Sequence, residues 1–171
     1  FFSYPLEAIR IKSDAEKKWE NIRYLSSMEL YEEAIEELAP LYDNLRGNYR
    51  YIYDYGYALH KCRRYQESIE VLNEGAAISS DPMFYNIIGK NQEAMGLYKD
   101  AEQAYLHAHY MVPQRLYPLT LLMRMHIKLG NNNMALEYAS AILDKPVNEL
   151  HRTMLRLRAD ARHCVDSLEC I

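Results

Sequence analysis

The sequence predicts an all-α protein, a right-handed α-solenoid of four helical hairpins closed by a C-terminal capping helix. The first observation is a small residue that recurs at Ala34, Ser68, Ala101 and Ala135, with separations of 34, 33 and 34 residues. The second is the three-to-four-residue spacing of apolar side chains around each of these positions, which is typical of helices. A repeat of this length is typical of stacked helix pairs, because one pair cannot bury its apolar face alone.

The third copy shows how one hairpin is encoded. Asp81 suits the N-cap of its first helix, and Pro82 suits the first helical turn. Gly96 can adopt the positive φ angle at which helices commonly end. One face of the first helix carries Tyr85, Ile88, Gly89 and Gln92. An apolar stripe on the second helix consists of Ala101, Ala104, Tyr105 and Ala108. The small residues predict that the two helices approach closely.

The other copies set the expected domain boundaries. The four repeats are expected at residues 15–47, 48–81, 82–114 and 115–146, after an N-terminal extension over residues 1–14. Residues 147–171 are expected to form the capping helix and a tail, with Asn148 as its N-cap and its arginines facing water.

One local pattern conflicts with a helix. Tyrosines alternate with other residues from Tyr49 to Tyr57, and this residue type at this spacing favours a β-strand when taken alone. Gly56 nevertheless lies 33 residues before Gly89, in the same register of the repeat. We therefore predict that the tyrosine-rich segment is helical.

Over roughly residues 15 to 146 the pattern resembles the tetratricopeptide repeat, a family of helical interaction scaffolds. The matching residues of the third copy are Gly89, Tyr98, Ala101, Tyr105, Ala108 and Pro113. Two features depart from the family pattern. The eighth position of the repeat, Gly89 in the third copy, is usually a small residue, but it is Met123 in the fourth copy. The second copy also has two extra residues before Asp81.

A narrower resemblance concerns three short segments, at residues 4–6, 111–118 and 141–147. Residues 111–118 are similar to the repeats that follow the membrane domain in O-antigen polymerase- and ligase-like proteins of Bacteroides-type bacteria. Residues 4–6 are similar to the end of the last membrane helix in that family, and residues 141–147 fit the same resemblance. This resemblance implies the soluble C-terminal domain of a membrane protein of polysaccharide assembly, tethered to the bacterial inner membrane. The apolar start without an initiator Met is expected for an excised piece of such a protein.

Net charge and cysteine content indicate which classes of partner and which cellular compartment to expect. The net charge of −4 argues against nucleic acid as a partner. The three cysteines, Cys62, Cys164 and Cys170, form no disulfide framework, although a Cys164–Cys170 bridge stays open if the tail is not helical. Free thiols favour the cytoplasmic side of the membrane, and a periplasmic position also stays open. Contact with the membrane is expected only through a region upstream of this chain.

The first helix of each hairpin is expected to line a concave groove, because stacked hairpins curve. Three of the four residues that follow the small eighth position are cationic, namely Arg23, Lys90 and Arg124. Charge-assisted hydrogen bonds from such cations suit an acidic protein or peptide segment. The alternative is that these basic side chains are merely solvated. The full set of expected groove residues is Trp19, Arg23, Tyr53, Tyr57, His60, Lys61, Asn86, Lys90, Tyr117, Arg124 and Lys128.

The expected function is that of a non-catalytic protein–protein interaction scaffold. A second function stays open, recognition of an anionic glycan or lipid-linked phosphate, as does weak self-association through the first repeat. No enzyme is expected, because the chain has no Gly-rich phosphate loop, GxSxG or HExxH motif. His107 and His109 point in divergent directions on a helix. No catalytic residue, cofactor or metal ligand is therefore predicted.

Overall fold

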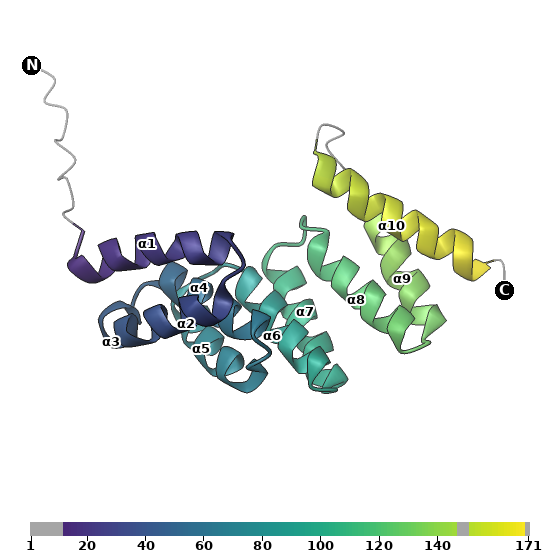
Figure 1. The fold of residues 1–171 in the computed structure, drawn as a ribbon. Coiled ribbons are helices and arrows are strands. Elements are labelled where there is room, and N and C mark those ends of the chain that lie inside the picture. The colour runs from purple at the N-terminus through teal and green to yellow at the C-terminus, as the bar shows by residue number, and fades with distance from the viewer. Residues whose placement is uncertain (1–11, 147–150, 170–171) are drawn as a thin grey trace, which may run out of the picture.

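The computed structural model describes residues 12–146 and 151–169, and this part of the chain is helical without a strand. Within it, four hairpins follow one another along the molecule, and the C-terminal helix lies across the last of them (Figure 1). The described chain therefore begins and ends at opposite ends of the stack. The predicted fold class is confirmed.

Each hairpin has a first helix and a second helix. The first helices are α1 (Asp14–Ser27), α4 (Tyr49–Lys61), α6 (Met83–Ala94) and α8 (Tyr117–Lys128). The second helices begin at Tyr31, Tyr65, Tyr98 and Asn132, and three of them are continuous: α5 (Tyr65–Ile78), α7 (Tyr98–Met111) and α9 (Asn132–Leu143). The tyrosine-rich segment that alternates like a strand is helix α4, as the repeat register predicts.

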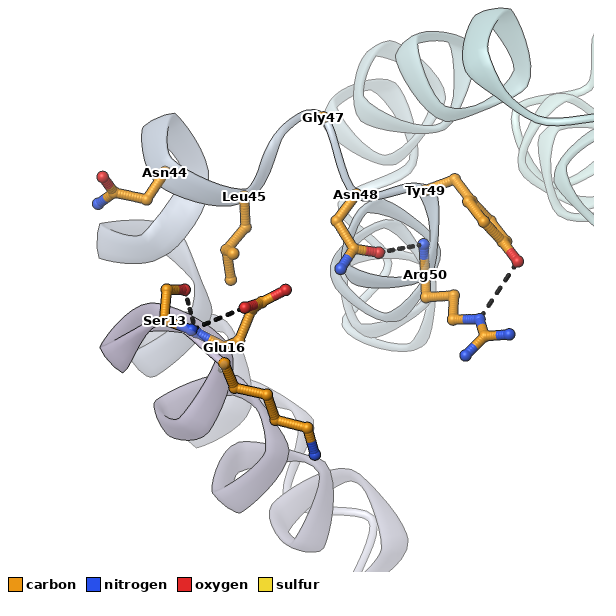
Figure 2. A pocket seen from close by; sticks show the side chains of 9 residues that line it. Ser13, Glu16, Asn44, Leu45, Gly47, Asn48, Tyr49 and Arg50 are labelled. Atoms are coloured by element: carbon orange, nitrogen blue, oxygen red, sulfur yellow. Dashed lines mark hydrogen bonds between the residues drawn. The ribbon is translucent and has the colours of Figure 1, made fainter. Parts of the chain in front are cut away.

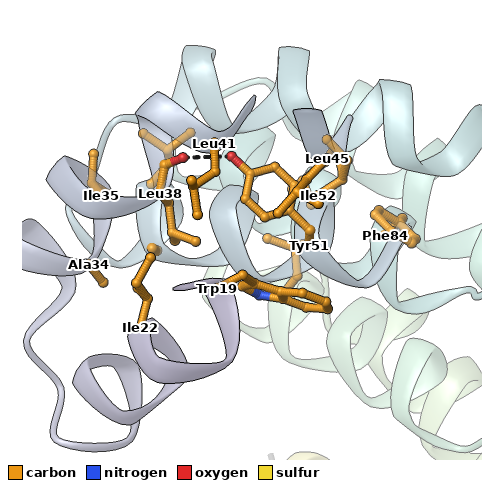
Figure 3. Close-up of a cluster of buried hydrophobic side chains, with 14 of the residues drawn as sticks. Trp19, Ile22, Ala34, Ile35, Leu38, Leu41, Leu45, Tyr51, Ile52 and Phe84 are labelled. Atoms are coloured by element: carbon orange, nitrogen blue, oxygen red, sulfur yellow. Dashed lines mark hydrogen bonds between the residues drawn. The ribbon is translucent and has the colours of Figure 1, made fainter. Parts of the chain in front are cut away.

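The second helix of the first hairpin is broken at Pro40. It consists of α2 (Tyr31–Leu38), a 3-10 turn η1 (Ala39–Leu41) and α3 (Tyr42–Leu45). Proline has no backbone N–H and disrupts the helical hydrogen bonds before it. The Tyr51 hydroxyl donates a 2.7 Å hydrogen bond to the backbone oxygen of Leu38, so this carbonyl is satisfied inside the core (Figure 3).

The turn inside every hairpin has the same backbone geometry. One residue shortly after each first helix has a positive φ angle, 62° at Glu29, 60° at Arg63, 78° at Gly96 and 70° at Gly130. In each turn the next residue donates a backbone hydrogen bond to the carbonyl five positions earlier, as Arg64 does to Leu59 at 2.9 Å. This is the Schellman motif, which satisfies the free carbonyls at a helix end.

Some glycines lie where two helices leave no room for a side chain. A Cβ atom at Gly89 would lie 2.5 Å from the Tyr105 ring, and one at Gly56 would lie 2.5 Å from Leu72. These two glycines occupy the small eighth position, so the prediction of close packing there is confirmed. In the fourth hairpin the eighth position is Met123, which is buried, and the register places the small Ala139 where the third hairpin has Tyr105.

Helix α10 (Arg152–Glu169) caps the stack by packing on α9. It buries Leu157, Ala161 and Cys164. The half-buried Arg158 guanidinium donates a 2.7 Å hydrogen bond to the backbone oxygen of Lys145, so the expectation that the arginines of this helix face water is wrong for Arg158. The predicted cap at Asn148 lies outside the described residues, as do Cys170 and the segment at residues 4–6. Cys62 and Cys164 are free thiols. Within the described residues, no helix is both long and apolar enough to cross a membrane.

Candidate functional site: the face lined by the first helices

The first helices α1, α4, α6 and α8 lie side by side and form one continuous face, called here the A-helix face. Direct side-chain contacts join each helix to the next. Arg23 on α1 contacts Asp54 on α4, His60 on α4 contacts Asn91 on α6, and Lys90 on α6 contacts Tyr117 on α8. The predicted groove residues from different hairpins are therefore neighbours in space.

At the α1 end of this face a half-buried carboxylate joins two hairpins. Asp54 Oδ2 accepts a 3.0 Å hydrogen bond from the Trp19 indole and lies 3.4 Å from the Arg23 Nε atom. The Arg23 guanidinium also lies over the Trp19 ring, 6.0 Å from its centroid. Burial raises the pKa of Asp54 above its ordinary value, and the Trp19 hydrogen bond and the Arg23 charge only partly oppose this.

Aromatic side chains continue this face along α4. The rings of Tyr53 and Tyr57 stack with centroids 6.1 Å apart and an interplanar angle of 10°. Tyr53 also meets Phe84 of α6 edge to face at 5.6 Å. Burial, together with the neighbouring hydroxyl and carboxyl groups, raises the pKa of Tyr53 to about 12. The hydroxyl is therefore a neutral hydrogen-bond donor at physiological pH.

A hydrogen-bonded chain lies beneath the middle of the face. The Ser68 hydroxyl donates to the backbone oxygen of Gly56 at 2.6 Å and accepts from the Asn91 amide at 2.8 Å. The Asn91 carbonyl oxygen lies 2.6 Å from His60 Nδ1. Burial lowers the pKa of His60, and the charges of Lys90 and Lys61 lower it further, against the Asn91 hydrogen bond that raises it.

The cations of the α8 end are mostly paired within the chain. Arg124 donates a hydrogen bond to Asp160 of the capping helix, and Lys128 Nζ lies 3.2 Å from Glu93 Oε1 of α6. Lys90 has no carboxylate partner within residues 12–146 and 151–169. Its ammonium donates a 2.7 Å hydrogen bond to the Tyr117 hydroxyl and lies 5.2 Å from the Tyr117 ring centroid.

Two of the predicted groove residues have almost no exposed surface. Asn86 is 1% exposed, its Oδ1 atom has no hydrogen-bond partner in the described chain, and its amide makes only a 3.5 Å contact with Met83 Sδ. Trp19 is 7% exposed, so little of its ring reaches the surface. The structure leaves the other predicted groove residues half-buried or exposed.

A pocket of about 460 Å³ opens on the A-helix face between α1, α4 and α6. We call it the Trp19 pocket. Four aromatic rings, two arginines and two aspartates line it: Trp19, Tyr49, Tyr53, Phe84, Arg23, Arg50, Asp54 and Asp81. Phe84 and Trp19 belong to the buried cluster of the first hairpins (Figure 3).

A larger pocket, of about 790 Å³, lies beside it, where α1 and α4 begin. Ser13 and Asn48 cap these two helices, with Ser13 accepting from the Glu16 N–H at 3.1 Å and Asn48 from the Arg50 N–H at 3.1 Å. Figure 2 shows Tyr49 and Arg50 joined by a hydrogen bond from the Arg50 Nε atom to the Tyr49 hydroxyl. Both residues also line the Trp19 pocket, so the two pockets are adjacent.

The predicted groove set does not include the acidic residues of this face. Asp54, Asp81 and Glu93 each contact a predicted groove cation or line the Trp19 pocket. Asp54 lies three positions before Tyr57, and Glu93 lies three positions after Lys90, so helical spacing is the signal that could have identified these two residues. Over the part of the chain that the structure describes, no group of three His, Cys, Asp or Glu side chains is arranged to hold a metal ion.

Comparisons with solved structures give the type of fold. The structure is similar to that of MamA, with a TM-score of 0.71, 19% sequence identity and 77% of each chain covered. It is similar to the TPR-like repeats of a Podospora anserina putative kinesin light chain, with a TM-score of 0.66, 15% identity and coverage of 94% of this chain and 96% of that one. The fold is a tetratricopeptide-type solenoid.

The Yersinia enterocolitica type III secretion translocator chaperone SycD is a further neighbour, with a TM-score of 0.58 and 17% identity over 75% of this chain and 95% of that one. No protein-family model and no curated protein matches the sequence. Because these structural likenesses have identities below one-fifth, they bear on the fold alone.

Proposed function

We propose that this protein is a non-catalytic interaction scaffold that holds an extended segment of a partner protein along its A-helix face. The observation that carries the proposal is the continuity of this face across four hairpins, with aromatic and cationic side chains along it. An extended segment can contact several hairpins at once, and aromatic side chains with arginines are enriched where protein interfaces gain their affinity. The solved neighbours include a translocator chaperone, which agrees with a protein-binding role.

An acidic segment is favoured at the middle of the face. Lys61 and Lys90 both lack a carboxylate partner within the described residues, and each instead lies 5.2 Å from a tyrosine ring centroid, Lys61 from Tyr31 and Lys90 from Tyr117. A partner carboxylate here would gain charge-assisted hydrogen bonds without breaking an existing ion pair. Arg124 and Lys128 are less suitable, because Asp160 and Glu93 already pair with them.

The second candidate, an anionic glycan or a lipid-linked phosphate, would use the same two lysines with the tyrosine rings as stacking surfaces. A protein segment would also contact the face through its peptide backbone, whereas a glycan or a lipid-linked phosphate has no peptide backbone. A binding assay with both kinds of ligand distinguishes them.

The test is a selection of short linear peptides displayed on phage, followed by titration of the enriched peptides. Acidic sequences are expected to be enriched, and Lys61→Glu/Lys90→Glu should weaken their binding by about tenfold or more, as expected for charge-assisted hydrogen bonds. Lys99→Glu is the matched control, because Lys99 is exposed on α7 and belongs to no ion pair in the described chain. Enriched peptides that bind the double variant as tightly as the wild type would refute the acidic segment. Binding of a phosphorylated oligosaccharide without any enriched peptide would favour the second candidate.

We further propose that the domain belongs to a membrane protein of O-antigen or polysaccharide assembly, on the resemblance of its short segments to such proteins. A run of membrane helices encoded upstream of Phe1 would support this context, and a stand-alone reading frame would refute it.

Weak self-association through the first hairpin is also proposed. Tyr24, which is 65% exposed on α1, is the residue to substitute by Glu in a sedimentation experiment. A shift of Tyr24→Glu toward the monomer at equal concentration would support the contact, and a wild type that is monomeric at every concentration would refute it.

A further inference from the structure

The Trp19 pocket has a charge and ring arrangement that differs from the middle of the A-helix face. Two aspartates contribute to its lining, and each uses one carboxylate oxygen for contacts within the chain. Asp54 Oδ2 contacts Trp19 and Arg23, whereas Asp81 Oδ1 accepts from the Met83 N–H at 3.0 Å and lies 3.4 Å from Arg115. The second oxygen of each, Asp54 Oδ1 and Asp81 Oδ2, has no hydrogen-bond partner in the described part of the chain.

Arg23, one of the two arginines that line the pocket, shows which chemistry the pocket favours. The Arg23 guanidinium lies over the Trp19 ring and beside Asp54, yet its side chain is 63% exposed and the contact with Asp54 is a long 3.4 Å. A guanidinium is attracted both by an aromatic face and by a carboxylate. Burial still raises the pKa of Asp54 against these partners, so the carboxylate is under-compensated and a further positive charge is favourable there.

We infer that the Trp19 pocket receives an arginine side chain of the bound segment, between the Trp19 and Tyr53 rings and against the free oxygens of Asp54 and Asp81. The inference rests on the proposed function, and it specifies one anchor of the partner. The pocket volume of about 460 Å³ accommodates an arginine side chain, and its lining supplies aromatic rings and acceptor oxygens together. The partner would then carry a basic anchor at the α1 end and acidic residues toward Lys61 and Lys90.

The alternative occupant of this pocket is a carboxylate held by Arg23 and Arg50. The two occupants differ in what Arg23 does to binding. For an arginine, Arg23 is a like charge and a competitor for Asp54, so removing it strengthens binding. For a carboxylate, Arg23 is a ligand, so removing it weakens binding.

The single tryptophan of the chain is Trp19, so its fluorescence reports on this pocket alone. N-acetyl-arginine amide is titrated in parallel with N-acetyl-citrulline amide, which has the same shape without the charge, and N-acetyl-glutamate amide. We expect a saturable change with the arginine probe and about tenfold weaker binding of the other two, since charged hydrogen bonds are roughly twice as strong as neutral ones. Equal binding of arginine and citrulline probes, or tighter binding of the glutamate probe, would overturn the inference.

Variants give the decisive comparison. Asp54→Asn keeps an oxygen for the Trp19 indole, and Asp81→Asn keeps one for the Met83 N–H, so both are expected to fold. Each variant should weaken the binding of the arginine probe severalfold, whereas Asp43→Asn, at an exposed position on α3, should leave this binding unchanged. Arg23→Ala should tighten the binding of the arginine probe severalfold, and weaker binding of this probe to Arg23→Ala would overturn the inference.

The two proposals fail separately. If acidic peptides bind along the face but neither the arginine probe nor Asp54→Asn has an effect, the anchor is wrong and the scaffold stands. If the arginine probe binds as described but no displayed peptide is enriched, the pocket is a cation site and the scaffold proposal fails.

Discussion

His60 Nδ1 lies 2.6 Å from the Oδ1 atom of Asn91, which has no exposed surface. Asn91 donates its amide hydrogen to Ser68, so its Oδ1 atom must accept from the histidine. His60 therefore carries its proton on Nδ1, and in the neutral ring Nε2 is left as an acceptor. The tautomer of His60, in the second hairpin, is thus set by Asn91 of the third hairpin.

This relationship predicts a pH-dependent stability. Burial lowers the pKa of His60 below its ordinary value of 6.5, so the unfolded chain binds a proton more readily than the folded one. The contribution of His60 to stability is therefore complete above about pH 6.5 and is lost as the pH falls below it. Urea unfolding from neutral to mildly acidic pH should show a decreasing midpoint in the wild type and a smaller decrease in His60→Gln. The exposed His151→Gln is the control, and an unchanged pH profile in His60→Gln would contradict the assignment.

Arg63 is expected to be a suboptimal residue at its turn. Its φ angle of 60° is left-handed, a conformation that costs a non-glycine residue about 1 kcal/mol or more. Glycine removes this cost but loses more entropy on folding. Arg63→Gly should therefore raise the free energy of unfolding by about 0.5 kcal/mol.

The same turn of the third hairpin supplies the reverse experiment. Gly96→Ala should lower the free energy of unfolding by about 1 kcal/mol, since its φ angle of 78° is left-handed and an added Cβ would have no atom within 4 Å to compensate. Urea denaturation measures both variants. A destabilised Arg63→Gly would show that the arginine makes a contribution beyond backbone geometry.

Gly89 is predicted to tolerate no side chain. A Cβ atom there would meet the Tyr105 ring at 2.5 Å, and overpacking of this kind costs about 1–3 kcal/mol. Gly47→Ala is the matched control, because no atom lies within 4 Å of a Cβ at Gly47 and its φ angle is not positive. Its unfolding free energy should lie within about 0.5 kcal/mol of the wild type. Equal losses in the two variants, measured by urea denaturation, would argue against packing as the reason for Gly89.

Arg158 is predicted to hold the capping helix on the last hairpin. It donates to the backbone oxygen of Lys145 at 2.7 Å, where α9 has just ended, and lies 3.5 Å from that of Ile142. Arg158→Ala should cost about 1–2 kcal/mol and should lower the hydrogen-exchange protection of α10 before that of α4 or α6. Arg156→Ala removes an exposed arginine of the same helix and should change neither measurement. Full protection of α10 in Arg158→Ala would place its attachment in its apolar side chains alone.

The spacing of residues along the sequence was sufficient to predict the fold, but it predicted only part of the candidate site. The recurrence at Ala34, Ser68, Ala101 and Ala135 predicted the hairpins, because every hairpin repeats the same close approach of its two helices. Pro40 interrupts the first hairpin, and no repeat position marks it. The groove was predicted from its aromatic and cationic residues, without the acidic ones. In the structure Arg23, Arg124 and Lys128 each have an acidic neighbour on another helix.

The sequence by itself determined the number of hairpins, the turns between their helices and which side of each first helix is turned away from its own second helix, toward the A-helix face. These depend on contacts within one hairpin, whose register is a matter of helical periodicity. Only the tertiary structure decided which charges on that face are already neutralised and where a pocket opens. Those contacts join residues about one repeat apart, such as Trp19 with Asp54, and they depend on how each hairpin is rotated against the next. That rotation is set by the shapes of packed side chains, which no single repeat encodes.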